Sequence, residues 1–228
     1  MGDMVEFPSN GSTGQGYLAV PESGAGPGVV VIQEWWGLVP HIQEVCDRYA
    51  AEGFVALAPD LYRGESTIEP DEAGKLMMAL NLQRAATDMS GAVTYLLDHD
   101  AVTSATVGVT GFCMGGGLAL VLACNEGERI GACVPFYGVI PWPDAQPDWS
   151  QLEAPVQGHF AENDGTFGPD AVAELETRLN DLGKQAELIV YPAVDHAFFN
   201  DTRPEVYDAE AAQLAWSRTL GFFRAHLH

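Results

Sequence analysis

The chain carries little positive charge. Lysine occurs only at Lys75 and Lys184, and 10 lysines and arginines stand against 32 aspartates and glutamates, which gives a formal net charge of −22. A surface of this charge repels phosphates, which excludes nucleic-acid binding as a function class. The acidic residues are spread over expected helix faces, such as 65–72 and 205–210, and this distribution indicates a solvated surface of an acidic protein.

Long apolar runs and clustered cysteines are also missing. No run of about eighteen apolar residues could span a bilayer, and residues 1–6 lack the basic and apolar regions of a signal peptide. Four scattered cysteines are too few for a disulfide framework, and no Cys-x-x-Cys or histidine-rich spacing indicates a metal site. We therefore expect a cytoplasmic protein with no cofactor and no membrane partner, whose Cys46, Cys124 and Cys133 are inert core residues.

The pattern of apolar runs predicts one α/β domain over residues 1–228. Strands that alternate with helices imply a mainly parallel sheet flanked by helices on both faces, and we expect a monomer. The expected strands cover residues 17–20, 29–33, 55–58, 106–110, 132–136, 156–159 and 187–191, and the expected helices cover 42–52, 70–79, 81–98, 115–125, 169–182 and 205–226.

The most informative segment is 106–117, where a β-branched run leads into Gly-Phe-Cys-Met-Gly and then into an Ala/Leu-rich helix. This is the layout of a nucleophile elbow, with Cys113 as the nucleophile. Small residues at Gly111 and Gly115 suit the sharp turn, and the start of the helix favours a developing negative charge on the thiol. Taken alone, the segment is equally compatible with a buried structural cysteine in a glycine-rich turn.

A cysteine nucleophile needs a base and a group that orients the base. Asp164 and His196 each follow the end of an expected strand, in the chain order nucleophile, acid, histidine. Glu162 and Asp195 compete for the role of the acid, but Asp195 adjoins His196, and neighbouring side chains on an extended segment point apart.

The other histidines fit base chemistry less well. His41 and His99 fall on expected helix surfaces or helix ends, and His226 and His228 lie in a terminus that we expect to fray. His159 lies within an expected strand, where a hydrogen-bonded structural histidine is the favoured interpretation.

An earlier motif completes the expected site. The buried strand of residues 29–33 ends in Gln-Glu-Trp-Trp-Gly, and in this architecture the following turn supplies one oxyanion-hole N–H group. The backbone N–H groups of Trp35 and Met114 are therefore the expected oxyanion donors. Glu34, which directly precedes Trp35, is expected to act near the thiol, although it could be a surface carboxylate.

With these residues assembled, the chain resembles the dienelactone hydrolases, also called carboxymethylenebutenolidases, over nearly its whole length. The resemblance rests on Gln-Glu-x-x-Gly at 33–37, Ala-Pro-Asp-Leu-Tyr at 58–62, Gly-Phe-Cys-x-Gly-Gly at 111–116, and on Asp164 and His196. It implies an α/β-hydrolase fold. It also implies Cys113 as nucleophile, His196 as general base and acid, Asp164 as its orienter, and Glu34 as the partner of the resting thiol. The reaction would pass through an acyl-thioester that water then hydrolyses.

One departure from the family pattern affects specificity. The family's enzymes bind the substrate carboxylate with arginines, and one of these lies four residues after the histidine, where this chain has Asn200. An amide recognises a carboxylate less well than a guanidinium does, although Arg203 lies close enough to substitute. Lys75 and Arg84 are candidates for the other family arginine. A neutral ester or lactone would instead meet an aromatic wall of Trp35, Trp36, Phe198 and Phe199.

Three functions remain open on the sequence alone. The first is a cysteine-dependent hydrolase of a lactone or ester, and the second is a general carboxylesterase or thioesterase for neutral substrates. The third is a non-catalytic relative that binds a small ligand, but such proteins usually lose a residue of the triad, and this chain keeps all three.

Overall fold

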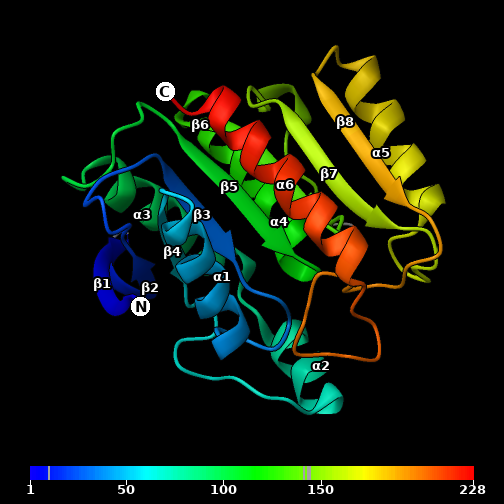
Figure 1. Ribbon diagram of the computed structural model, residues 1–228, viewed down its shortest axis with the longest axis horizontal. Coiled ribbons are helices and arrows are strands. Elements are labelled where there is room, and N and C mark those ends of the chain that lie inside the picture. Colours follow the sequence, from blue (N-terminus) through cyan, green and yellow to red (C-terminus); the bar gives the residue numbers. More distant parts are fainter. Residues whose placement is uncertain (10, 141, 143–144) are drawn as a thin grey trace. The chain divides into compact units, whose positions relative to one another are not determined.

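The structure is a computed structural model that describes residues 1–9, 11–140, 142 and 145–228. Within these ranges the chain forms eight strands and six α-helices (Figure 1). The strands are β1 (Asp3–Ser9), β2 (Ser12–Ala19), β3 (Gly28–Ile32), β4 (Val55–Pro59), β5 (Val107–Phe112), β6 (Ile130–Phe136), β7 (Val156–Ala161) and β8 (Ala186–Tyr191). The α-helices are α1 (Pro40–Ala51), α2 (Pro70–Ala79), α3 (Leu82–Leu97), α4 (Met114–Glu126), α5 (Pro169–Asp181) and α6 (Ala209–His226).

The chain divides into two compact units. The first unit comprises Met1–Val109 with Leu227–His228. Its strands follow the order β1-β2-β4-β3, in which β1 and β2 are antiparallel neighbours, β2 and β4 are antiparallel, and β3 and β4 are parallel. In Figure 1, α1 lies in front of these strands and α3 behind them.

The second unit comprises Thr110–His226, so β5 begins in the first unit and ends in the second. Its strands β6, β7 and β8 are parallel neighbours, with Phe136 paired to His159 and Ala161 paired to Tyr191. Helix α6 lies in front of these strands in Figure 1, and α4 lies behind them. The mainly parallel α/β class is therefore confirmed, whereas the single domain over residues 1–228 stays a prediction.

Burial explains why these segments form strands and helices. All residues of β3, β4, β5 and β7 are buried, as expected for parallel strands that helices cover on both faces. Helices α1, α2 and α5 each begin with a proline, whose fixed φ suits the first helical position. The side chain of Asn81 caps α3 by accepting a hydrogen bond from the backbone N–H of Arg84 at 2.9 Å.

Two expectations about these elements were wrong. Strand β1 and the first half of β2 were missed because β1 contains Pro8 and polar residues and β2 contains Gly14 and Gly16, which weaken the strand signal. Helix α6 begins at Ala209 and not near residue 205, because Asp208 caps it by accepting a hydrogen bond from the backbone N–H of Ala211 at 2.8 Å.

Two expectations about histidines were also wrong. His41 is buried and does not lie on the surface of α1, because the start of this helix faces the core of the first unit. The C-terminus is not frayed: α6 continues to His226, Leu227 is buried, and the carbonyl oxygen of His228 accepts a hydrogen bond from the backbone N–H of Ala105 at 2.8 Å. The cysteines Cys46, Cys124 and Cys133 are buried, as the sequence predicted.

In the part of the chain that the structure describes, every helix is too short or too polar to cross a membrane.

Candidate active site

The elbow in the second unit places Cys113 between a buried strand and a buried helix. Cys113 follows Phe112, the last residue of β5, and precedes Met114, the first residue of α4. Its backbone has φ 56° and ψ −119°, a strained conformation for a residue with a side chain, and it is fixed by a hydrogen bond from its N–H to the carbonyl oxygen of Phe136 at 3.0 Å. The thiol side chain is partly exposed and lies at the N-terminus of α4, where the helix dipole favours negative charge.

Close backbone approaches explain several of the glycines around the elbow. A Cβ atom on Gly116 would lie 2.7 Å from the carbonyl oxygen of Phe136, and one on Gly138 would overlap the carbonyl oxygen of Cys113. Gly138 was not singled out from the sequence, because its contact with the elbow joins residues 25 positions apart in the chain. The turn after β6 therefore fixes Cys113 from outside the elbow motif.

We expect Gly138→Ala to destabilise the protein and to slow catalysis. The added methyl group must displace the carbonyl of Cys113, and such overpacking costs about 1–3 kcal/mol, while a displaced nucleophile lowers kcat by about 10- to 100-fold. Urea denaturation and steady-state kinetics would measure the two effects. The matched control is Gly221→Ala, because a Cβ atom there meets nothing within 4 Å. A Gly138→Ala protein as stable and active as this control would contradict the contact.

The predicted acid and histidine are hydrogen bonded to each other. Asp164 follows β7, His196 follows β8, and the Oδ2 atom of Asp164 lies 2.5 Å from the Nδ1 atom of His196. The Oδ1 atom of Asp164 accepts hydrogen bonds from the backbone N–H groups of Thr166 at 2.8 Å and Phe167 at 2.9 Å. The carboxylate is therefore held by three partners, which fixes the orientation of the imidazole.

The competing carboxylates occupy other positions. Glu162 is exposed, and its Oε2 atom accepts a hydrogen bond from the backbone N–H of Ala193 at 2.8 Å, which ties the two loops together. Asp195 is exposed beside His196. These positions favour Asp164 over both carboxylates, although its role as the orienting acid stays a prediction.

The electrostatics of this cluster favour a charged imidazole. Burial by itself lowers the pKa of His196, but hydrogen bonds and charges from Asp164 and from the Cys113 thiol outweigh it and raise the pKa to about 10. Burial tends to raise the pKa of Asp164, but its hydrogen bonds to His196 and to two backbone N–H groups outweigh this and lower it. Hydrogen bonds thus connect Cys113, His196 and Asp164 in one series.

Sequence reasoning missed the aromatic residues around His196. The ring of Tyr137 contacts the imidazole edge-on at a centroid distance of 5.1 Å, and the ring of Phe167 lies 6.0 Å away. Tyr137 has φ 35° and directly follows β6. Since ligands of parallel sheets bind at the carboxyl ends of strands, the end of β6 was a signal that could have identified Tyr137.

The remaining predicted residues fall into two groups. The first group, Glu34, Trp35 and Trp36, belongs to the first unit. Glu34 is buried, and the half-buried rings of Trp35 and Trp36 meet edge-on at a centroid distance of 4.9 Å. The roles of these three residues beside Cys113 stay predictions. The side chains of Phe198 and Phe199 are buried in the second unit against other aromatic rings, so their contact with substrate stays a prediction as well.

The two polar candidates for substrate recognition have partners within the protein. The Oδ1 atom of the buried Asn200 accepts hydrogen bonds from the N–H of Thr202 at 3.1 Å and from its hydroxyl at 2.6 Å. The Nε atom of Arg203 lies 2.9 Å from the Oε1 atom of Glu205. A substrate carboxylate would therefore have to compete with Glu205 for Arg203.

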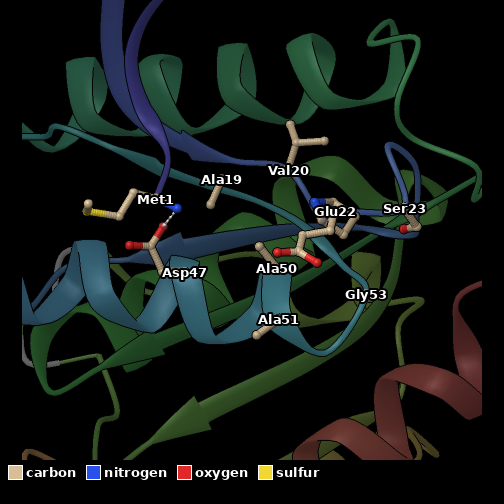
Figure 2. A pocket seen from close by; sticks show the side chains of 10 residues that line it. Met1, Ala19, Val20, Glu22, Ser23, Asp47, Ala50, Ala51 and Gly53 are labelled. Atoms are coloured by element: carbon tan, nitrogen blue, oxygen red, sulfur yellow. Dashed lines mark ion pairs between the residues drawn. The ribbon is translucent and has the colours of Figure 1, made fainter.

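The molecule also contains a cavity in the first unit. Its volume is about 510 Å³, and the N-terminal amine of Met1 lies 3.9 Å from the Oδ1 atom of Asp47. Figure 2 shows this ion pair among the side chains that line the cavity. The residues that line it include Glu22, Ser23 and Gly53, and none of the predicted site residues is among them. Within the described residues, no group of three or more histidine, cysteine or acidic side chains could hold a metal ion.

Comparison with known proteins agrees with the predicted resemblance. The model of the dienelactone hydrolase family matches residues 15–227. Protein usf of Aquifex pyrophilus is 41% identical, and a protein of Aquifex aeolicus named "Putative carboxymethylenebutenolidase" is 37% identical; in both cases the match covers 100% of each chain. The crystal structure of a "Putative Dienelactone Hydrolase" from Klebsiella pneumoniae has 30% identity and a TM-score of 0.88, and covers 98% of both chains.

The expected α/β-hydrolase fold and the carboxylic ester hydrolase class are thereby confirmed. The chain belongs to the dienelactone hydrolase family.

Proposed function

We propose that this hydrolase cleaves a small ester or lactone through a cysteine-bound acyl intermediate. The observation that carries the proposal is the connected chain from Asp164 through His196 to the Cys113 thiol. An imidazole oriented by a carboxylate and bonded to a nucleophile is the arrangement that activates nucleophiles in acyl-transfer enzymes.

Acylation starts when His196 takes the proton of the Cys113 thiol, which gives a thiolate and an imidazolium. The sulfur of Cys113 attacks the carbonyl carbon of the substrate, and the carbonyl π electrons move to the oxygen. In this proposal the backbone N–H group of Met114 stabilises the oxyanion. The carbonyl then re-forms, the C–O bond to the alcohol breaks, and the leaving oxygen takes the proton from His196. The products of this half-reaction are a thioester on Cys113, a free alcohol group and a neutral imidazole.

Deacylation uses the neutral imidazole as a base. His196 takes a proton from a water molecule as the water oxygen attacks the thioester carbon. The C–S bond then breaks, the carboxylic acid leaves, and the thiolate–imidazolium pair is restored. Asp164 remains ionised throughout, because its lowered pKa keeps the carboxylate charged beside the imidazolium.

A neutral substrate is favoured over an anionic one in this proposal. The cationic side chains that the structure describes in the second unit already have partners: Arg129 with Glu126, Arg178 with Gln146, Lys184 with Glu153, Arg203 with Glu205, and Arg218 with Tyr191, while Arg224 is also engaged. The formal net charge of −22 also repels an anionic substrate at long range. The carboxylated dienelactone is the alternative substrate, with Arg203 as its partner.

The test compares kcat/KM for dienelactone and for a neutral aryl acetate, with wild type and Arg203→Gln. We expect the neutral ester to have the higher kcat/KM, and the ratio of the two substrates to change by less than about threefold in the variant. A preference for dienelactone that falls in Arg203→Gln by about 10- to 100-fold would show that Arg203 binds the carboxylate. That factor corresponds to the loss of one charge-assisted hydrogen bond. Failure to hydrolyse either ester would contradict the proposed function.

A further inference from the structure

His159 is a buried histidine of the second unit for which the proposed reaction has no use. It lies on β7, and its exposed fraction is 0%. Both ring nitrogens have partners: Nδ1 lies 3.0 Å from the hydroxyl of Tyr191, and Nε2 lies 3.0 Å from the hydroxyl of Thr219. The interpretation of His159 as a hydrogen-bonded structural histidine is therefore confirmed, and these contacts also fix its protonation.

The direction of each hydrogen bond around His159 follows from the further hydrogen bonds that Thr219 and Tyr191 make. The hydroxyl of Thr219 donates to the carbonyl oxygen of Ala215 at 2.9 Å, so it can only accept from His159. Nε2 must then carry the proton, and Nδ1 accepts the hydroxyl proton of Tyr191. The Tyr191 oxygen in turn accepts from the Nη1 atom of Arg218 at 3.1 Å. The result is one unbroken series of donors from Arg218 through Tyr191 and His159 to Thr219.

The charge states agree with this series. Burial, together with the nearby charge of Arg218, lowers the pKa of His159 to about 3, so the ring is neutral at neutral pH. Burial raises the pKa of Tyr191 despite the opposing effect of Arg218, so the phenol keeps the proton that it donates. Neither His159 nor Tyr191 therefore has to gain or lose a proton near neutral pH.

The series connects α6 to the ends of the two strands that carry the proposed catalytic loops. His159 lies two residues before the end of β7, and Asp164 follows that strand; Tyr191 is the last residue of β8, and His196 follows it. The carbonyl oxygen of Tyr191 accepts a hydrogen bond from the N–H of Glu162 at 3.0 Å, which joins the end of β8 to the first residue of the loop after β7. A movement of Tyr191 would therefore displace both loops.

Aromatic contacts extend from the same residues to the imidazole of His196. The ring of Tyr191 contacts Phe198 at 5.1 Å, Phe198 contacts Tyr137 at 5.5 Å, and Tyr137 contacts His196 at 5.1 Å. The carbonyl oxygen of His159 also accepts a hydrogen bond from the N–H of Tyr137 at 2.7 Å. His159 thus contacts two members of this aromatic path, Tyr191 through its side chain and Tyr137 through its backbone.

We propose that His159, held as the Nε2–H tautomer between Tyr191 and Thr219, is a positioning residue for the Asp164–His196 pair. This inference rests on the proposed function, because it assigns a role in the same site. His159 does not touch the reacting atoms. It acts by fixing the positions of Tyr191 and Tyr137. Tyr191 then holds the loop that carries His196, and Tyr137 holds the imidazole ring of His196. Proton transfer tolerates only small displacements of this ring.

The variants that test the proposal remove single hydroxyl groups and keep the packing. Tyr191→Phe leaves Nδ1 of His159 without its donor, and Thr219→Val leaves Nε2–H without its acceptor. We expect both variants to lower kcat for a neutral aryl acetate by about 10-fold or more, with KM changed by less than about twofold. The pKa seen in the pH profile of kcat should also shift, since His196 would be less well held against Asp164.

Leu179→Val is the matched control for a purely structural effect. Leu179 is fully buried on α5 in the same unit, so this variant loses stability by a change in packing alone. We expect a lowered Tm with kcat unchanged. If Tyr191→Phe and Thr219→Val behave like Leu179→Val, with lower Tm, unchanged kcat and an unchanged pH profile, the positioning role is refuted.

A second measurement does not depend on activity. In nitrogen-15 spectra of the wild-type protein, His159 should show a protonated Nε2 and an unprotonated Nδ1, with no titration between about pH 5 and 8. In Tyr191→Phe this tautomer preference should weaken. An Nδ1–H tautomer in the wild type would overturn the assigned series. If the wild type shows the expected tautomer but hydrolyses neither ester, the proposed function is refuted and the hydrogen-bond series stands.

Discussion

Replacing Cys113 with alanine is expected to lower kcat for an aryl acetate by about 10⁴- to 10⁶-fold, the loss that follows removal of the nucleophile from a catalytic triad. The variant should fold, because alanine keeps the backbone path of the elbow and removes one partly exposed sulfur atom. Stopped-flow measurement with wild type should show a burst of alcohol release as the acyl intermediate accumulates, and Cys113→Ala should show none.

The matched control for this prediction is Cys124→Ala. Cys124 lies in the same unit on α4, and burial raises the pKa of its thiol to about 12, so it is not a nucleophile at neutral pH. Alkylation by iodoacetamide should modify Cys113 in step with the loss of activity and should leave the buried Cys46, Cys124 and Cys133 unmodified. Full activity in Cys113→Ala would mean that the elbow is not the active site.

Replacing Asp164 with asparagine is expected to lower kcat by about 10⁴-fold. Two backbone N–H groups donate to Oδ1 of Asp164, so the asparagine oxygen will occupy that position and its NH₂ group will face His196. An NH₂ group can only donate, which forces Nδ1 of His196 to accept and places the proton on Nε2. The imidazole is then in the wrong tautomer to take a proton from water in deacylation.

The same variant should change the dependence of stability on pH. The pKa of His196 is raised in the folded protein, so its contribution to stability is fully present below its unfolded pKa of about 6.5 and is lost as the pH rises through about 10. The pKa of Asp164 is lowered, so its contribution is present above about pH 4 and is lost as the pH falls through the lowered folded value. In Asp164→Asn both contributions should be largely absent.

Urea denaturation at pH 7 and pH 10 would measure this difference. The wild type should lose more of its free energy of unfolding between these two pH values than the variant does, because the other titrating groups are common to both proteins. Asp195→Asn is the control, since Asp195 is an exposed carboxylate adjacent to His196, and kcat should stay within about twofold of wild type. Similar losses of activity in Asp195→Asn and Asp164→Asn would refute the assignment of the acid.

The sequence predicted the elements whose signal is local. Continuous apolar runs identified β3 and β5 to within two residues. Prolines identified the starts of α2 at Pro70 and of α5 at Pro169. It failed where the local signal was weak. Strand β1 contains several polar residues and Pro8, and it forms because it pairs along its whole length with β2. Its stability comes from that partner strand and not from its own composition.

The sequence by itself determined the elbow and the order of the predicted nucleophile, acid and histidine, because glycine spacing and strand ends are properties of short segments. Only the tertiary structure decided which groups meet. It placed Gly138 against the carbonyl of Cys113, the ring of Tyr137 against His196, and His159 between Tyr191 and Thr219. These contacts join residues that lie between 25 and 60 positions apart, and their close approach depends on how helices and strands pack. Periodicity along the chain reports which face of an element is buried, but not which partner buries it.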